Sequence, residues 1–439
     1  MASIPFAERV ESRPSPIWRL VCVTILVGIG AGLGGMGLSL LLHAVQHVAY
    51  GYGEGSPIGA ETFFEGVAAA SRERRLIALL ACGVVAGLGW WALDRFGRPR
   101  VDLSRAVNAD NPRMPFGTTV LHAVLQTVTV ALGSPLGREV APREVGAVLA
   151  GALSRRARLT AHETRIMLAC GACAGAGLAS VYNVPLAGAV FTLEVLLATF
   201  AWSALLPALA TSVIAAVVAW IGLGNAAQYR VPALAVDASL IVWSLVAGPP
   251  IGVAAYGFRR LGALARAPSN LRGWKRALLC VVVFVGIGWL AGGFPQILGN
   301  GKGPAQLGFD GDLSAGTAVV VLLLKVAVVM VALRVGAHGG LLTPGLSCGA
   351  LFAIALGHAW SIWWPGPASG AYALVGAAAF LSASMAMPLT AILLVFEFTR
   401  IGHDFVVPIL FAVAGSVGAS RLCAVAEEAR RARTAARQV

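Results

Sequence analysis

The segment Gly133-Ser-Pro-Leu-Gly-Arg-Glu-Val-Ala-Pro142 decides the fold of this chain, because a similar segment follows it at a fixed distance. The second segment is Gly336-Ala-His-Gly-Gly-Leu-Leu-Thr-Pro344, and it lies 203 residues later, with Gly336 in the place of Gly133. Each segment holds two glycines four residues apart and ends on a proline. The repetition predicts that the chain consists of two related halves.

A second pair of landmarks repeats at the same offset of 203 residues. The Pro-Leu pair at Pro185 is followed by the lone acid Glu194, and the Pro-Leu pair at Pro388 is followed at the same spacing by Glu397. Helical transport proteins are often built from two repeats, with the site near the middle of the membrane where the repeats meet. We therefore predict an N-terminal tail (residues 1–15), a first membrane repeat (16–232), a second membrane repeat (233–424) and a basic C-terminal tail (425–439).

Apolar residues dominate the composition and predict a membrane protein. Of the 439 residues, 58% are hydrophobic and 12% are charged, and the mean hydropathy is +0.79. Soluble domains carry roughly 25% charged residues. Apolar runs near the length that spans hydrocarbon occur at 20–42, 76–93, 191–223, 277–291 and 318–333. These runs do not alternate with a period of two, which argues against a barrel, so the predicted fold is all-α.

Prolines inside apolar stretches predict broken and re-entrant helices. Pro135 and Pro142 divide their stretch into pieces too short to cross a bilayer. Non-helical backbone at membrane depth is tolerated only where it is buried in protein or lines a cavity. The breaks therefore indicate a path through the protein. If each half crosses an odd number of times, the two halves form an inverted repeat.

The formal net charge of +13 is explained by topology. Cationic residues gather near the two ends of the chain: Arg9, Arg13, Arg19, Arg421, Arg430, Arg431, Arg433 and Arg437. Because basic segments beside membrane helices tend to stay in the cytoplasm, we expect both termini there and an even number of crossings. The compactness of the chain leads us to expect the plasma (inner) membrane of a prokaryote. The charge is spread over short loops and tails, which argues against a nucleic-acid partner.

The duplicated segments contain what an anion site inside a bilayer needs. Backbone N–H groups at helix N-termini attract anions through partial charges, at a lower cost than a full counter-charge. Gly137–Pro142 and Gly340–Pro344 each offer a glycine for close approach and a proline that the first helical turn tolerates. In an inverted repeat two such N-termini can point at one place, where we expect a small anion to bind.

Glu139 is the candidate gate of this site. An ionisable residue inside a membrane segment is a functional candidate by default. Its carboxylate could occupy the place of the anion when ionised and leave it when protonated. The alternatives are an Arg138–Glu139 pair that only neutralises itself, or a glutamate in an external loop. Arg138 would raise the positive potential, and we expect it to pair with a buried acid such as Asp102.

Other polar and reactive residues have structural explanations. The duplication of Glu194 and Glu397 late in apolar helices favours a role at a helix end. Lys325 either reaches toward the membrane surface or faces the path. Cys170 and Cys173 have redox spacing, but their apolar surroundings indicate buried free thiols.

Two further motifs suggest other chemistry. Gly345-Leu-Ser-Cys-Gly349 matches the G-x-S-x-G elbow of serine hydrolases, with Ser347 as nucleophile, although no predicted strand precedes it. His43 and His47 could present two metal ligands on one helix, but no acidic or cysteine residue lies near them in the sequence. We expect no enzymatic activity, no metal and no cofactor, and intramembrane hydrolysis by Ser347 is the distant alternative.

At the duplicated motifs the chain resembles the CLC family of chloride channels and chloride/proton exchangers. Gly137-Arg-Glu-Val-Ala141 is similar to the family signature G-[KR]-E-G-P, and Gly340-Leu-Leu-Thr-Pro344 is similar to G-x-F-x-P. The helix start Asn183-Val-Pro-Leu-Ala-Gly188 also matches. The resemblance covers residues 20–425 and implies an intertwined inverted-repeat fold, a homodimer and one anion path in each subunit.

The resemblance also implies roles for individual residues. Glu139 falls on the gating glutamate and proton acceptor. The anion-binding groups would be Gly137, Arg138, Val140, Gly340, Leu341 and Leu342. The first family signature, G-S-G-I-P, is replaced by Gly97-Arg-Pro-Arg-Val101. Arg98 thereby stands at the anion-coordinating serine and is an expected anion contact.

Two further departures concern the mode of transport. The tyrosine that contacts the anion in many members has no counterpart, since the last tyrosine of the chain is Tyr372. The internal glutamate of exchangers aligns with Val195. We expect transport of small anions, chloride first, by a CLC-type channel gated by Glu139. Antiport of chloride or fluoride against protons is the near alternative, and a non-conducting relative disabled by Arg98 is the third.

Overall fold

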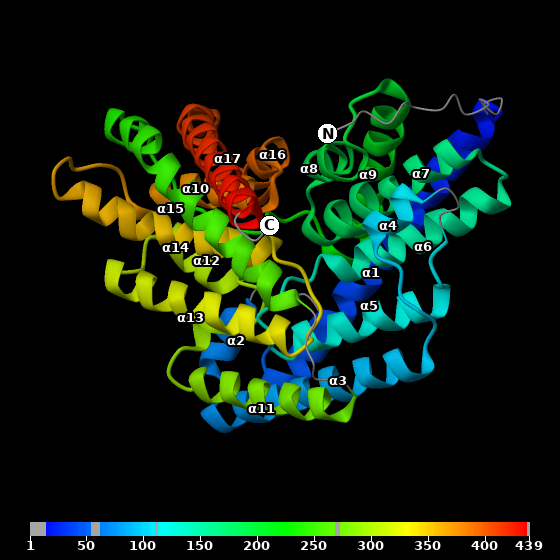
Figure 1. Ribbon diagram of the computed structural model, residues 1–439, viewed down its shortest axis with the longest axis horizontal. Coiled ribbons are helices and arrows are strands. Elements are labelled where there is room, and N and C mark those ends of the chain that lie inside the picture. Colours follow the sequence, from blue (N-terminus) through cyan, green and yellow to red (C-terminus); the bar gives the residue numbers. More distant parts are fainter. Residues whose placement is uncertain (1–14, 54–61, 110–112, 268–272, 437–439) are drawn as a thin grey trace.

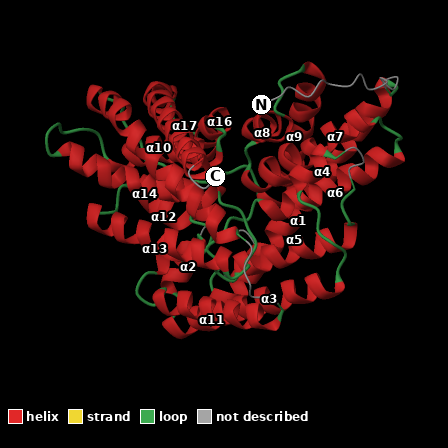
Figure 2. Cartoon of the chain, viewed as in Figure 1, coloured by secondary structure: helices red, strands yellow, loops and turns green. Residues whose placement is uncertain are grey.

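The computed structural model describes residues 15–53, 62–109, 113–267 and 273–436. Every regular element in these ranges is a helix, and no described residue belongs to a strand (Figure 2). The all-α prediction is therefore confirmed. Most of the predicted N-terminal tail (residues 1–14) and Arg437 lie outside the described residues.

The two halves of the chain are joined by a non-helical segment at 224–237. The first half forms α1 (Ile17–Tyr50), α2 (Phe63–Ala69), α3 (Arg72–Phe96), α4 (Leu103–Asn108), α5 (Phe116–Ala131), α6 (Val140–Arg156), α7 (Ala161–Ala169), η1 (Cys170–Ser180), α8 (Pro185–Phe191), η2 (Thr192–Leu197) and α9 (Trp202–Leu223). The second half forms α10 (Ala238–Arg266), α11 (Trp274–Leu290), η3 (Pro295–Ile297), α12 (Lys302–Asp310), α13 (Ala315–Arg334), α14 (Leu342–Ser361), α15 (Ser369–Met385), α16 (Pro388–Thr399), η4 (His403–Phe405) and α17 (Val406–Ala436). The described part of the predicted C-terminal tail continues α17.

Each half of the chain contains both long and short apolar helices. Among the described residues, seven spans are long and apolar enough to cross a membrane: α1, α3, α9, α10, α13, α14 and α17 with η4. Four apolar helices are shorter: α5, α15, α16, and α8 with η2. The apolar run at 191–223 is divided, because Ala198 adopts a left-handed φ of 50° after η2 and α9 begins at Trp202. The short helices agree with the predicted breaks.

Figure 1 shows the two halves side by side, the first coloured blue to green and the second green to red. Elements also pack across the boundary between the halves. The helix α3 packs against α11 along one edge of the molecule, and α8 packs against α16 at the opposite edge. These exchanged contacts join both halves into one intertwined unit.

Glycines let equivalent helices approach closely in both halves. A Cβ at Gly146 in α6 would overlap the carbonyl oxygen of Gly171 in η1. Gly349 in α14, which lies 203 residues after Gly146, meets α15 in the same way: its Cβ would lie 2.7 Å from the carbonyl oxygen of Gly376. Membrane helices associate through such small residues. The matched contacts support the organisation in two repeats.

Candidate functional site

The two duplicated segments meet at a reciprocal pair of backbone hydrogen bonds. Gly137 N donates to Gly340 O at 2.8 Å, and Gly340 N donates to Gly137 O at 2.9 Å. The chain then enters α6 at Val140 and α14 at Leu342. The structure thus brings together the starts of two helices that are 203 residues apart in the sequence.

The carboxylate of Glu139 lies at this junction. The residue is 2% exposed, and its Oε1 accepts a hydrogen bond of 3.0 Å from Leu342 N. Its Oε2 lies 3.4 Å from the hydroxyl of Tyr182, which donates to it. The N-terminus of α14, which attracts negative charge, therefore donates to a buried carboxyl group from the other half of the chain.

Arg138 has other partners than those expected. Its Nη2 donates to Val181 O at 3.2 Å, and its guanidinium lies 4.8 Å from the ring centroid of Tyr182. The predicted pair with Asp102 is wrong, because Asp102 is exposed at the start of α4. A self-neutralising pair with Glu139 is also absent from the ion pairs of the described residues. The positive charge of Arg138 instead lies beside the tyrosine that contacts the gate.

The structure does not bring Arg98 into this group. Its side chain is exposed after the end of α3, and its backbone N donates to Thr118 Oγ1 at 3.1 Å. Leu341 and Leu342, by contrast, are buried at the start of α14, and Val140 opens α6. The role of Arg98 in anion binding stays a prediction.

A polar cluster that sequence reasoning missed lies beside the junction. Arg100 Nη1 bonds both His122 Nε2 (3.0 Å) and His338 Nε2 (3.1 Å), and its Nη2 bonds Asp94 at 2.9 Å. His122 Nδ1 lies 2.7 Å from Glu144 Oε2. The cluster ties the loop before α14 to α5 and α6. The position of His122 inside an apolar helix could have indicated this cluster from the sequence.

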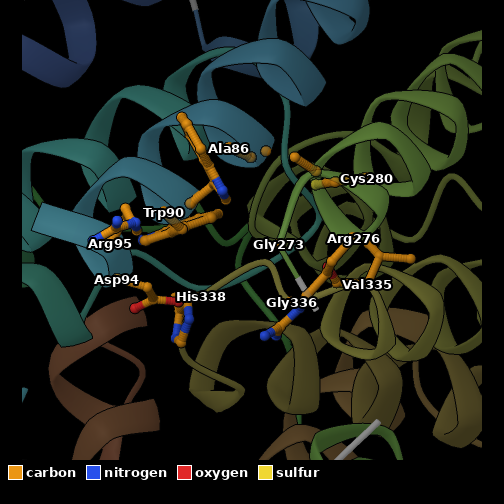
Figure 3. A pocket seen from close by; sticks show the side chains of 13 residues that line it. Ala86, Trp90, Asp94, Arg95, Gly273, Arg276, Cys280, Val335, Gly336 and His338 are labelled. Carbon is orange, nitrogen blue, oxygen red and sulfur yellow. The ribbon is translucent and has the colours of Figure 1, made fainter. Parts of the chain in front are cut away.

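A cavity of about 290 Å³ lies between α3 and α11 (Figure 3). Arg95 and Arg276 face it from opposite walls, and Trp90 also lines it. The cavity adjoins Gly336 and His338, which belong to the loop that leads to Gly340. Two guanidinium groups thus line a cavity at the loop that leads into α14.

Glu194 and Glu397 bind the helix starts of the opposite halves. The bonds are Leu389 N to Glu194 Oε1 (3.0 Å), Thr390 N to Glu194 Oε2 (2.8 Å), Leu186 N to Glu397 Oε1 (3.0 Å) and Ala187 N to Glu397 Oε2 (2.7 Å). Each carboxylate therefore caps the N-terminus of the Pro-Leu helix in the other half. The predicted structural role at helix ends is confirmed.

Lys325 does not reach the surface. It is fully buried, and its Nζ donates to Ile297 O (2.9 Å) and Gly299 O (2.6 Å). The expected reach toward the membrane surface was therefore wrong. The side chain instead stabilises the loop between η3 and α12.

The remaining candidates have local partners. Ser347 Oγ donates to Pro344 O at 2.9 Å inside α14, and no histidine, lysine or carboxylate among the described residues bonds it. His43 Nδ1 bonds Ser39 O, and no described group of three or more residues could hold a metal ion. Cys170 and Cys173 are buried free thiols, as expected.

Curated relatives extend over most of the chain. Residues 82–421 match the family of voltage gated chloride channels. A putative chloride channel protein ClcB-like of Ralstonia nicotianae is 29% identical over 352 residues, which cover 77% of this chain and 80% of the relative. The voltage-gated ClC-type chloride channel ClcB of Citrobacter koseri is 28% identical over 403 residues, which cover 87% of this chain and 91% of the relative.

Solved structures share the fold. A slow cyanobacterial Cl⁻/H⁺ antiporter has a TM-score of 0.78 at 20% identity and covers 92% of this chain and 95% of its own. A CLC-type fluoride/proton antiporter has a TM-score of 0.68 at 17% identity, with 92% and 96% covered. At these identities the likeness concerns the fold, and it confirms the predicted CLC-like architecture. The match over residues 82–421, together with the meeting of the two duplicated motifs, shows that this integral membrane protein belongs to the CLC family of voltage gated chloride channels.

Proposed function

We propose that this chain conducts small anions across the membrane through a path gated by Glu139, with chloride as the main ion. The observation that carries the proposal is the 3.0 Å hydrogen bond from Leu342 N to Glu139 Oε1. That N–H group belongs to a helix start without a side-chain cap from its own N-cap residue, a position that attracts negative charge. Glu139 occupies a place where the same donor would hold a chloride ion.

Movement of one carboxylate would open and close this path. When ionised, Glu139 competes with the anion for Leu342 N–H through a charge-assisted hydrogen bond. When protonated, it loses that advantage, and an anion can replace it. Leu341 and the backbone of Gly137, Val140 and Gly340 provide the remaining proposed contacts, with Arg138 adding positive potential.

Passive conduction is the first mode that we propose. Val195 aligns with the internal glutamate of exchangers, and its side chain has no ionisable group that could relay a proton. The residue is 37% exposed. Exchange of chloride or fluoride against protons is the second candidate. It is favoured by Glu139 itself, because a buried carboxyl group hydrogen-bonded to Tyr182 can take up a proton each time an anion displaces it.

Ion flux from liposomes that contain the purified protein tests the proposal. The native protein should release chloride, without proton movement in a channel and with proton uptake in an exchanger. A fluoride/proton exchanger would move protons with fluoride and not with chloride. Absence of flux of either anion would overturn the proposal.

The variant Glu139→Gln tests the gate. It removes the ionisable group, so the change of chloride flux with pH that the native protein shows should be lost. Asp102→Asn, which removes an exposed carboxylate, is the matched control and should keep the native pH profile. A native pH profile in Glu139→Gln would exclude Glu139 as the gate.

We further propose a homodimer in the plasma (inner) membrane, with one path in each subunit and no cofactor. Membership of the CLC family, which implies a homodimer, supports self-association. Single-molecule photobleaching of labelled protein in bilayers should show two steps per particle. One step per particle, at a labelling efficiency measured separately, would contradict the dimer.

A further inference from the structure

Tyr182 contributes a buried hydroxyl group beside the gate. The residue is 3% exposed and lies between η1 and α8. Its hydroxyl is 3.4 Å from Glu139 Oε2 and 3.1 Å from Thr343 Oγ1. Thr343, which is 2% exposed, stands in the first turn of α14 directly after Leu342. One hydroxyl group and one backbone N–H group therefore donate to the Glu139 carboxylate, and the Thr343 hydroxyl meets the Tyr182 hydroxyl.

Aromatic and polar neighbours fix the position of the Tyr182 ring. Phe398 of α16 meets it edge-on, with ring centroids 5.5 Å apart, and the guanidinium of Arg138 lies 4.8 Å from its centroid. The next residue, Asn183, accepts a 2.7 Å hydrogen bond from Trp220 Nε1. The hydroxyl is thus held in place from several elements, beside a positive charge that favours an anionic partner.

The geometry determines in which direction the hydroxyl donates. A tyrosine hydroxyl has one proton to donate and can accept as well. With Glu139 in place, Thr343 donates to Tyr182, and Tyr182 donates to Glu139 Oε2. When Glu139 withdraws, the Leu342 N–H loses its acceptor, and the Tyr182 O–H keeps only Thr343 Oγ1 as an alternative acceptor. Buried donors without an acceptor are costly, so the departing carboxylate requires a replacement.

We propose that Tyr182 is an anion-coordinating residue, whose hydroxyl, positioned by Thr343, donates to the transported anion after Glu139 has left. This inference rests on the proposed function and names a ligand of the same path. The O–H group replaces part of the hydration shell of the anion. It therefore favours a strongly hydrated ion such as chloride over a weakly hydrated one such as thiocyanate.

Chloride titration of purified Glu139→Ala protein by calorimetry tests the inference, because this background removes the competing carboxylate. Adding Tyr182→Phe keeps the ring and removes the hydroxyl. We expect chloride affinity to fall about tenfold, the value of one hydrogen bond to a charged group, with a smaller change for thiocyanate. Tyr372→Phe in the same background is the matched control. Tyr372 is buried, its hydroxyl has no hydrogen-bond partner among the described residues, and chloride affinity should not change.

Thr343 provides a second, independent test. In the same Glu139→Ala background, Thr343→Val removes the orienting hydroxyl at similar shape and should weaken chloride binding several-fold, whereas Thr343→Ser should restore it. This pair decides the matter if Tyr182→Phe does not fold, as judged by thermal melting. Equal chloride affinity in the Tyr182→Phe and control proteins would overturn the inference and leave the Glu139-gated path intact. No chloride binding to Glu139→Ala protein, with no flux by the native protein, would overturn both.

Discussion

Gly137 and Gly340 have no Cβ, and this makes room for the carboxylate of Glu139. Both glycines and the glutamate could be predicted, because the duplicated pattern displays them in the sequence. Tyr182 could not, since its partners Glu139 and Thr343 lie 43 and 161 residues away. An aromatic residue in an apolar stretch gives no sign of such contacts. The choice of Asp102 as the partner of Arg138 failed for the same reason.

The first residue-scale prediction concerns the room beside Glu139. A Cβ at Gly340 would overlap Glu139 Oε1, so Gly340→Ala places a methyl group in the seat of both carboxylate and anion. We expect chloride flux from liposomes to fall more than tenfold, the effect of about 1.4 kcal/mol of lost binding. Gly316→Ala, where a Cβ meets nothing within 4 Å, is the control and should conduct normally. Native flux in Gly340→Ala would contradict the proposal that the anion binds beside Gly340.

The second residue-scale prediction concerns Lys325. Lys325→Met keeps the length of the side chain but leaves the carbonyl oxygens of Ile297 and Gly299 without their donor. We expect a loss of about 2–4 kcal/mol of stability, seen as a lower midpoint in thermal melting in detergent. Lys275→Met, which changes an exposed lysine, should melt like the native protein. Equal midpoints would show that the two carbonyl groups find other partners.

At the scale of helices, contacts at the helix starts connect the two halves of the chain. The Pro-Leu starts of α8 and α16 were visible in the sequence, and so were the acids that cap them. Which helix each acid would cap was not visible, because the bonds cross from one half to the other over 195 to 211 residues. The break after η2 was also missed, since Ala198 is not a residue type that announces a left-handed turn.

The prediction for these helices is a matched loss of stability. Glu194→Gln and Glu397→Gln each replace a carboxylate at a helix N-terminus by a neutral amide. Each should cost about 1–2 kcal/mol, because each carboxylate accepts two backbone N–H bonds. Glu194→Gln should lie at the upper end of this range, because Thr390 Oγ1 also donates to Glu194 Oε2 at 2.6 Å. Thermal melting checks this, with Glu428→Gln on the exposed side of α17 as the unaffected control. Losses in only one of the two variants would argue against equivalent caps.

At the scale of the molecule, the repeat predicted two halves. In the structure the halves are joined by helices that pack across their boundary, α3 against α11 and α8 against α16. Composition predicted the membrane, and the broken runs predicted short helices near the site. The continuation of α17 to Ala436 was not expected, because its basic final turns resemble a solvated tail. Arginines favour helix as much as apolar residues do, so charge alone did not mark where this helix ends.

The topology gives a prediction at this scale. Basic residues near both termini should keep both ends in the cytoplasm. A reporter that fluoresces only in the cytoplasm, fused to either end in a bacterial host, should be bright in both fusions. A reporter active only outside the inner membrane should stay silent in both. One bright and one dark fluorescent fusion would require an odd number of crossings.

The reciprocal bonds between Gly137 and Gly340 have a consequence for any shortened form of the protein. Each half of the chain contains a backbone donor and a backbone acceptor whose hydrogen-bond partners lie in the other half. If the chain is cut in the 224–237 connection, each isolated fragment would either bury unpaired backbone N–H and C=O groups or leave this region unfolded. Two fragments produced in the same cell would still supply each other's hydrogen-bond partners, so we expect them to assemble without the covalent connection.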